Sequence, residues 1–122
     1  MNAITLLLKE HDSHRRLLEA ISEEPSLFPT LREELIYHVN MEEDVFYPGL
    51  LKVKDLEAVV REAWEEHSLL MQLLQEMDEL LTGGKEWKPK FEVFKKLMLV
   101  HLETEEKELF PKISSLASSE YL

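Results

Sequence analysis

The sequence predicts an all-α protein, folded as a single up-down-up-down antiparallel four-helix bundle that spans residues 1–122. Three observations support this fold. Glycine is scarce, with three residues in the chain. Segments rich in Leu, Glu and Lys are separated by Pro and Gly, and apolar residues within each segment recur at alternating steps of three and four, the period of a helix with one buried face. The length suits one domain and is too short for two ordinary ones.

The first two helices are bounded by polar caps and prolines. We expect Asn2 or Thr5 to cap a first helix that runs to about Ser22. The next segment begins with the capping-box pattern of Thr30 and Glu33, and we expect this second helix to reach residue 46 or 47. The proline at position 48 must disturb the backbone there, although the helix can continue briefly beyond it.

The third and fourth helices are bounded in the same way. We expect the third over about residues 55–82, ending at the two glycines 83–84, which suit a helix C-terminus. Pro89 suits the first turn of the fourth helix, which we expect to end at about Leu109, before Pro111.

Polar residues interrupt the predicted core face of every helix. All five histidines of the chain and two glutamates lie on these faces. The predicted core positions are Ile4, Leu7, His11, His14, Leu18 and Ile21; Leu31, Leu35, His38, Glu42 and Val45; Val60, Ala63, His67, Leu70, Leu74, Met77 and Leu81; and Phe91, Phe94, Met98, His101, Glu105 and Leu109. A lone histidine on an apolar face is more often an ordinary core residue than a metal ligand.

Glu42 and Glu105 are harder to explain as ordinary core residues. Burying an ionised carboxylate without a partner costs several kcal/mol. The predicted core faces contain no Lys or Arg that could pair with either glutamate. A cation from solution is therefore the simplest partner.

The candidate ligands are expected at one level of the bundle. Short loops make consecutive helices antiparallel neighbours, and each residue advances a helix by about 1.5 Å. Counting from the helix ends places His11 opposite Glu42, and places His67 opposite a point between residues 101 and 105. The six residues that converge on this level are His11, His38, Glu42, His67, His101 and Glu105.

The two halves of the chain repeat each other around these residues. HVNMEEDVFYP, which begins at His38, aligns without gaps onto HLETEEKELFP, which begins at His101. EHDSHRRLL, which begins at Glu10, aligns onto EHSLLMQLL, which begins at Glu66. A single His-x3-Glu is a weak motif, but two copies with shared flanks, each preceded by a Glu-His helix, are a strong indication of a pseudo-twofold metal site.

These four segments resemble the hemerythrin-like family, the HHE cation-binding domains, over most of the chain from Leu6 to about Ile113. The resemblance implies a four-helix bundle with a non-haem centre of two iron ions of the Fe-O-Fe type. It also implies that His11, His38, His67 and His101 are terminal ligands and that Glu42 and Glu105 bridge the ions. The same nitrogen and carboxylate ligands also suit zinc or manganese. The Glu-x-x-His motif of ferritin-like sites does not occur in the chain.

The resemblance implies that the centre binds or senses a small ligand, namely dioxygen, nitric oxide or peroxide. Met71 and Glu106 occupy positions where oxygen-carrying members have His and Asp, so reversible oxygen transport is not the expected role. Iron handling, metal-centre repair and a structural bundle that holds zinc remain open alternatives, and enzymatic turnover is the less favoured expectation.

The composition limits the partners and the location. A net charge of −11 disfavours nucleic acid and anionic membranes. With no cysteine, the chain has neither a disulfide framework nor thiolate ligands. Since it also has no recognisable signal peptide and no apolar run long enough to cross a membrane, we expect a cytoplasmic protein. The sequence does not indicate the oligomeric state.

Several residues near the candidate ligands are expected to have roles other than metal ligation. His14 aligns with Leu70 and has no counterpart in the second half, so we expect it to be a core residue or a support for a ligand rather than a fifth histidine ligand. Met71 is expected to pack beside the site and limit its access to solvent. Tyr47 and Phe110, each before a proline, are expected to plug the core at the helix ends.

Four further glutamates lie next to the candidate ligands in sequence. Glu43 and Glu106 are expected to be solvated, although Glu106 could replace Glu105 as a ligand. Glu10 and Glu66 are expected to point outward, with a hydrogen bond to a neighbouring imidazole as the alternative.

Overall fold

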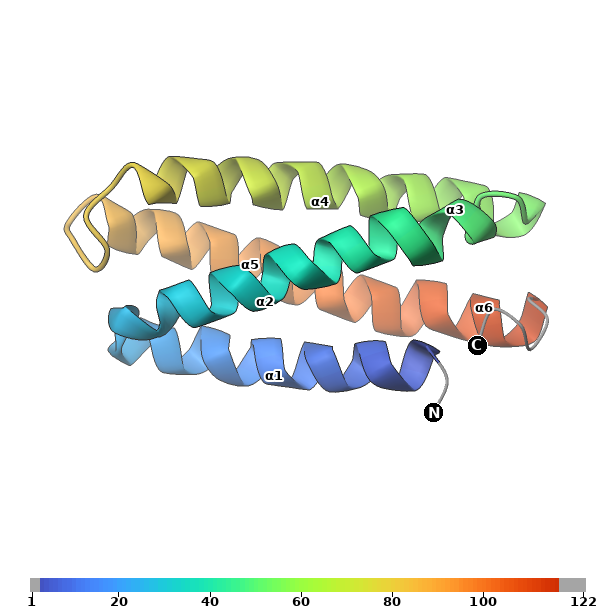
Figure 1. The fold of residues 1–122 in the computed structure, drawn as a ribbon, viewed down its shortest axis with the longest axis horizontal. Helices are drawn as coiled ribbons and strands as arrows, with labels where there is room; N and C mark the ends of the chain where they lie inside the picture. Colours follow the sequence, from blue (N-terminus) through green and yellow to red (C-terminus); the bar gives the residue numbers. More distant parts are fainter. Residues whose placement is uncertain (1–2, 117–122) are drawn as a thin grey trace.

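The computed structural model describes residues 3–116, and within this range it contains helices and no strand. The four long helices and their continuations lie side by side as a bundle (Figure 1). The longer elements are α1 (Ala3–Glu23), α2 (Phe28–Met41), α4 (Glu57–Asp78) and α5 (Trp87–Thr104); α3 (Tyr47–Leu50) continues the line of α2, and α6 (Phe110–Leu116) continues that of α5. The prediction of an all-α bundle is therefore confirmed.

Figure 1 also shows the order of the helices. The sequence colours run in one direction along α1 and α4, and in the opposite direction along α2 and α5. Short 3-10 turns at Pro25–Leu27 and Lys54–Leu56 precede α2 and α4.

Two apolar clusters form the core, and the polar core residues lie between them. One cluster includes Leu18 of α1 and Trp87 of α5, and the Trp87 ring stacks on Phe91 with centroids 5.0 Å apart. The other includes Leu7 of α1 and Tyr47 of α3. Each large apolar side chain that is fully buried contributes about 1.5–3 kcal/mol. The two clusters therefore stabilise the bundle from both ends and leave the middle layer free for polar groups.

The structure excludes two of the predicted caps, Thr5 and Thr30. Thr5 lies inside α1 and is not its N-cap, while Asn2 lies outside the described residues. The predicted capping box at Thr30 is wrong, because α2 begins at Phe28 with Pro29 in its first turn and no side-chain cap. A proline fits this turn well, since its missing N–H would have no partner in the helix.

The third helix ends earlier than predicted. It stops at Asp78, and Leu81, a predicted core residue, is 82% exposed. Beyond Asp78 the backbone makes a hydrogen bond that spans three residues instead of four, from the Leu80 N–H to the Met77 carbonyl at 3.0 Å. Gly83 has a φ of +78°, which favours glycine, so the glycine pair turns the chain a few residues after the helix has ended.

The fourth helix does not end before Pro111 as predicted. The chain continues through a π-helical turn at Glu105–Leu109 into α6, and an equivalent π-helical turn at Glu42–Phe46 connects α2 to α3. In each turn the following residue donates its N–H to the carbonyl five residues back: Tyr47 to Glu42, and Phe110 to Glu105. A proline has no N–H to donate to the preceding turn. Because the residue before each proline bonds to the carbonyl five residues back, the helix continues beyond the proline.

The π-helical turn also changes which residues face the core. Val45, a predicted core residue, is 74% exposed, and its neighbour Phe46 is buried instead. A regular helix of 3.6 residues per turn would have kept Val45 on the inner face. The extra residue in the turn rotates the rest of the helix, so the prediction for Val45 is wrong.

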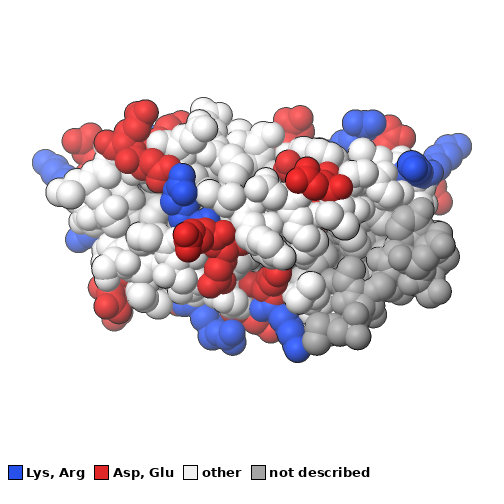
Figure 2. Space-filling view, in the orientation of Figure 1, with Lys and Arg blue, Asp and Glu red and all other residues white. Residues whose placement is uncertain are grey.

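The outer surface is acidic in several places rather than in one. On the face shown in Figure 2, Asp and Glu side chains gather in separate groups, and Lys and Arg side chains lie mostly towards the edges of the view. Among residues 3–116, no helix is both long and apolar enough to cross a lipid bilayer.

Candidate metal centre

The six predicted ligands lie together in the layer between the two apolar clusters. Their side chains are almost completely removed from solvent, with relative exposures between 0% and 3%. They come from all four long helices and the two π-helical turns: His11, His38, Glu42, His67, His101 and Glu105. The structure therefore brings together the residues that the sequence singled out.

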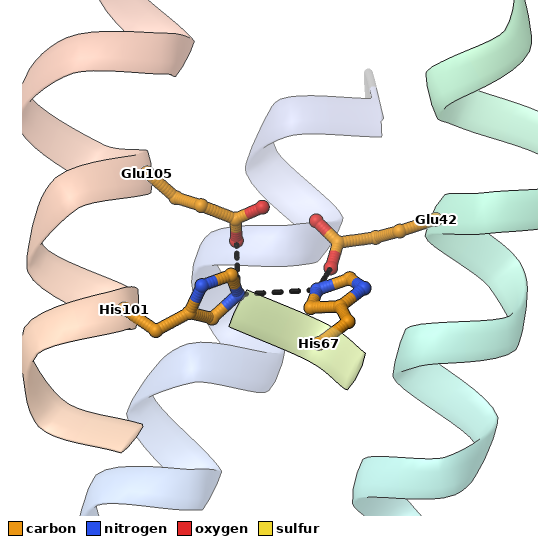
Figure 3. Close-up of side chains that lie close together, drawn as sticks. All are labelled: Glu42, His67, His101 and Glu105. Carbon is orange, nitrogen blue, oxygen red and sulfur yellow. Dashed lines mark hydrogen bonds and ion pairs between the residues drawn. The ribbon is translucent and has the colours of Figure 1, made fainter. Parts of the chain in front are cut away.

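The ligand atoms fall into two groups that share a carboxylate. In one group, atoms of Glu42, His67, His101 and Glu105 all lie within 4.8 Å of one another, and Figure 3 shows these side chains converging from three directions. In the other group, atoms of His11, His38 and Glu105 lie within the same limit. The arrangement could hold two cations, one for each group, with Glu105 between them.

Both buried carboxylates face histidines from both halves of the chain. Glu42 Oε1 lies 3.1 Å from His38 Nε2 and 3.2 Å from His67 Nε2. Glu105 Oε1 lies 3.1 Å from His11 Nε2 and 3.8 Å from His101 Nε2. Each glutamate therefore lies between two histidines, one from each half of the chain.

Regular helix leads up to both glutamates, and the π-helical turns begin there. Each turn begins at a ligand, Glu42 in one and Glu105 in the other. Turns of this kind are frequent at functional sites.

Two histidines are oriented by glutamates that the sequence placed in solvent. His11 Nδ1 donates to Glu106 Oε2 at 2.8 Å, and His67 Nδ1 donates to Glu43 Oε2 at 2.8 Å. The prediction that Glu43 and Glu106 are solvated is wrong, because each carboxylate is only 23% exposed and holds an imidazole. Arg15 also donates to Glu106, at 2.8 Å, and so fixes that carboxylate from outside.

The other two histidines are oriented in an equivalent way. His38 Nδ1 donates to Glu10 Oε1 at 2.5 Å, and His101 Nδ1 donates to Glu66 Oε1 at 2.6 Å. The outward orientation expected of Glu10 and Glu66 is therefore not observed, and the alternative of a hydrogen bond to an imidazole is. With all four Nδ1 atoms bonded to carboxylates, all four Nε2 atoms are left for the centre of the layer.

Several atoms at the centre have no hydrogen-bond partner among the described residues. They are Nε2 of His11 and His38, both oxygens of Glu42 and Oε1 of Glu105. Nitrogen and oxygen atoms lie close together there, but they are not aligned as hydrogen bonds. Buried polar atoms are rarely left in this state, and coordination to a cation would satisfy them.

The electrostatics of the layer fit the same conclusion. Burial and the charge of Glu42 raise the pKa of Glu105. Burial alone would lower the pKa of His38, but the neighbouring Glu42 carboxylate outweighs it and raises that pKa to about 9. Both shifts favour the protonated form of the group concerned, so protons and cations would compete for the layer.

Tyr47 is more than the core plug that the sequence predicted. Its hydroxyl donates to Glu105 Oε2 at 2.5 Å and lies 3.4 Å from His67 Nε2. Its ring stacks on His67 at a centroid distance of 5.4 Å, as that of Phe110 stacks on His11 at 5.7 Å. The two aromatic residues are thus equivalent in position, and only Tyr47 adds a hydroxyl to the centre.

His14 lies beside the centre but in neither ligand group. Its side chain is 1% exposed, its ring centroid lies 5.2 Å from that of His38, and its Nδ1 has no hydrogen-bond partner in the described part of the chain. Burial and the charges of His38 and His11 lower the pKa of His14 to about 3.

Sequence reasoning missed the orienting roles of Glu43 and Glu106 and the Tyr47 hydroxyl, and gave the roles of Glu10 and Glu66 only as an alternative. A signal for the glutamates was present, because Glu-His recurs at Glu10 and Glu66, and Glu-Glu recurs at Glu42 and Glu105. Repetition of an acidic neighbour in both halves indicates a shared function. Tyr47 had no such signal, since its counterpart is Phe110.

Comparison with known protein families agrees with a cation-binding role for this layer. The family described as hemerythrin HHE cation binding domain matches residues 2–113. Comparison with curated proteins and with solved structures gave no match. The matched range contains every residue of the two ligand groups.

Proposed function

We propose that this chain, which belongs to the hemerythrin HHE cation-binding family, holds two iron ions in the buried layer and binds a small ligand there, namely dioxygen, nitric oxide or peroxide. The observation that carries the proposal is the shared carboxylate. Glu105 belongs to both ligand groups, which suits a pair of neighbouring cations better than a single one.

The residues divide into two equivalent sets. His11 and His38 would hold one ion, His67 and His101 would hold the other, and Glu42 and Glu105 would bridge them. When bound, the iron pair supplies an open coordination position and the capacity to exchange electrons with a small ligand.

The protein contributes orientation and the exclusion of bulk water. Hydrogen bonds from the Nδ1 atoms to Glu10, Glu43, Glu66 and Glu106 fix the imidazole rings. The apolar clusters on either side keep the layer dry, which strengthens electrostatic interactions inside it.

Two features beside His67 favour the binding of a small ligand there. The hydroxyl of Tyr47, beside His67, is a group that can hydrogen-bond a polar ligand at this position. A surface hollow of about 510 Å³ also reaches His67 and Glu43. Met71 lines this hollow, in keeping with its expected role beside the site.

Anaerobic purification followed by reconstitution with ferrous iron tests the proposal. We expect two irons per chain, near-ultraviolet absorption after oxidation, and a change of spectrum with nitric oxide. A colourless protein that takes up only zinc would instead support a structural bundle. Rapid transfer of the bound iron to an acceptor, without any response to nitric oxide or dioxygen, would support iron handling or metal-centre repair.

A further inference from the structure

A second polar site adjoins the centre on the side of α1 and α2. A surface cleft of about 480 Å³ lies between these helices. Three carboxylates and one histidine are among its lining residues, which are Lys9, Glu10, Ser13, His14, Glu33, Glu34 and Tyr37. Lys9 is the one basic side chain in this set, so acidic groups dominate the cleft.

Burying His14 beside this cleft costs free energy that its own contacts do not offset. It is buried, and its Nδ1 has no hydrogen-bond partner among residues 3–116. Its Nε2 lies 3.9 Å from Glu34 Oε1, beyond hydrogen-bond distance. A buried polar atom without a partner, such as Nδ1 here, destabilises a protein by about 1–3 kcal/mol, so a histidine at this position requires another explanation.

The second half of the bundle shows that the fold does not need this histidine. Leu70 occupies the equivalent position on α4 and is buried in the apolar core. A leucine satisfies the packing requirement there without an unpaired nitrogen. His14 therefore serves something specific to the first half.

The cleft is in direct contact with the ligands of the centre. The His14 ring meets the His38 ring edge to face at 5.2 Å. Glu10 lines the cleft and also accepts the hydrogen bond from His38 Nδ1. A cation held at His14 would thus be one side chain away from its final ligands.

The hollow on the opposite side is less suited to a cation. It contains one carboxylate, Glu43, which is already bonded to His67. In the α1–α2 cleft, Glu34 has one short contact, accepted from Ser13 Oγ at 2.9 Å, and its side chain is 41% exposed. Glu34 is therefore accessible to an incoming cation.

We infer that His14 and Glu34 form a transient site for a divalent cation, through which metal enters the buried centre. This inference rests on the proposed function, since it concerns how that same centre is filled. An imidazole and a carboxylate are suitable ligands for ferrous, manganous and zinc ions. The surrounding acidic groups raise the local concentration of cations and so accelerate their capture.

The rate of metal uptake tests the inference. Metal-free protein is mixed anaerobically with ferrous iron, and uptake is followed by quenching with a chelator at successive times. We expect His14→Leu and Glu34→Gln to slow uptake by roughly tenfold, the lower end of the range expected for losing an attractive site. Both variants should reach the same final iron content as the parent.

Matched controls separate this effect from changes in folding and charge. The variant Glu62→Gln makes the same change in net charge at an exposed position outside the cleft, and it should load at the parental rate. The Leu70 environment indicates that His14→Leu will fold, and Glu34→Gln tests the cleft without altering the core.

The outcomes distinguish the inference from the function on which it rests. Parental uptake rates in both cleft variants would overturn the inference alone. A lower final iron content in His14→Leu would also overturn it, because His14 would then be a resident ligand. A parent protein that takes up no metal would overturn the proposed function, and the inference with it.

Discussion

The first helix pair, α1 with α2, and the second, α4 with α5, supply matching ligands to the buried layer and surround them with different neighbours. Each half contributes two histidines and one glutamate. In the first half, His14 lies beside His38, and Arg15 donates a hydrogen bond to Glu106, the glutamate that orients His11. The equivalent positions in the second half are Leu70 and Met71.

A further difference lies at the two prolines. Phe110 stacks on His11, while Tyr47 stacks on His67 and adds a hydroxyl that donates to Glu105. The pseudo-twofold repeat thus supplies the same types of candidate ligand twice, in different environments. This difference teaches that the repeat governs metal binding, whereas the residues that depart from it can assign separate roles to the two positions.

The largest effect is expected from the shared carboxylate. Glu105→Ala should abolish nearly all metal binding, because Glu105 belongs to both ligand groups. His101→Ala should weaken mainly the cation position that includes His67, and His14→Ala should leave the metal content unchanged. Metal analysis of the three variants after identical reconstitution checks this order. Equal metal content in all three would contradict the assignment of the ligands.

The orienting glutamates should have the next largest effect. Glu43→Gln and Glu106→Gln should each lower metal affinity by about 10–100-fold, since losing a partner that orients a ligating histidine usually has this effect. Competition with a chelator measures the affinity. Glu103→Gln, an exposed change beside a lysine, serves as the control. If Glu43→Gln and Glu106→Gln bind as tightly as this control, the Nδ1 hydrogen bonds do not support the site.

Tyr47→Phe removes the hydroxyl difference between the halves. In the metal-free protein it should lower the free energy of unfolding by about 1–3 kcal/mol, because Glu105 loses its hydrogen-bond donor inside the core. Denaturant unfolding without metal measures this change. The variant should retain the iron and alter the spectrum of the nitric oxide complex. Phe110→Tyr is the reciprocal change, and an identical spectrum in Tyr47→Phe and the parent would argue against contact of Tyr47 with the ligand.

The smallest effect is expected from Arg15→Met, which introduces the residue type found at the equivalent position of the second half, Met71. Burial would raise the pKa of Glu106, but hydrogen bonds from Arg15 and His11 outweigh it and lower that pKa below 4.5. A depressed carboxyl pKa stabilises the fold above the unfolded value, and this contribution is lost as the pH falls through the folded value.

We therefore expect Arg15→Met to cost about 1 kcal/mol at neutral pH, a small figure because the Arg15 side chain is 35% exposed. The difference from the parent should shrink as the pH falls below 4.5, because protonated Glu106 no longer attracts Arg15. Unfolding of the metal-free proteins across this range measures both. A difference that stays constant down to acid pH would show that Arg15 acts through packing rather than through Glu106.

Much of the fold and the candidate site could be read from local patterns. Helical periodicity placed His11 and His67 on inner faces, and the repeat related them to each other before any distance was known. The helix ends were less predictable. The second helix begins at Phe28, with Pro29 in its first turn, and not at the predicted Thr30 capping box. The glycine pair lies in the turn that follows α4 and not at the end of that helix. An N-cap contributes only about 1 kcal/mol, so packing easily overrides it.

The sequence by itself determined that the bundle carries a buried layer of histidines and glutamates, because helical period and internal repetition are properties of the chain alone. Only the tertiary structure decided how these groups are held. The π-helical turns after Glu42 and Glu105 each insert one residue into a helix. The four bonds between Nδ1 atoms and glutamates, and the bond from the Tyr47 hydroxyl to Glu105, join different helices. Such contacts join residues far apart in the chain, and a regular helical pattern carries no information about an inserted residue or about the side chains that it meets.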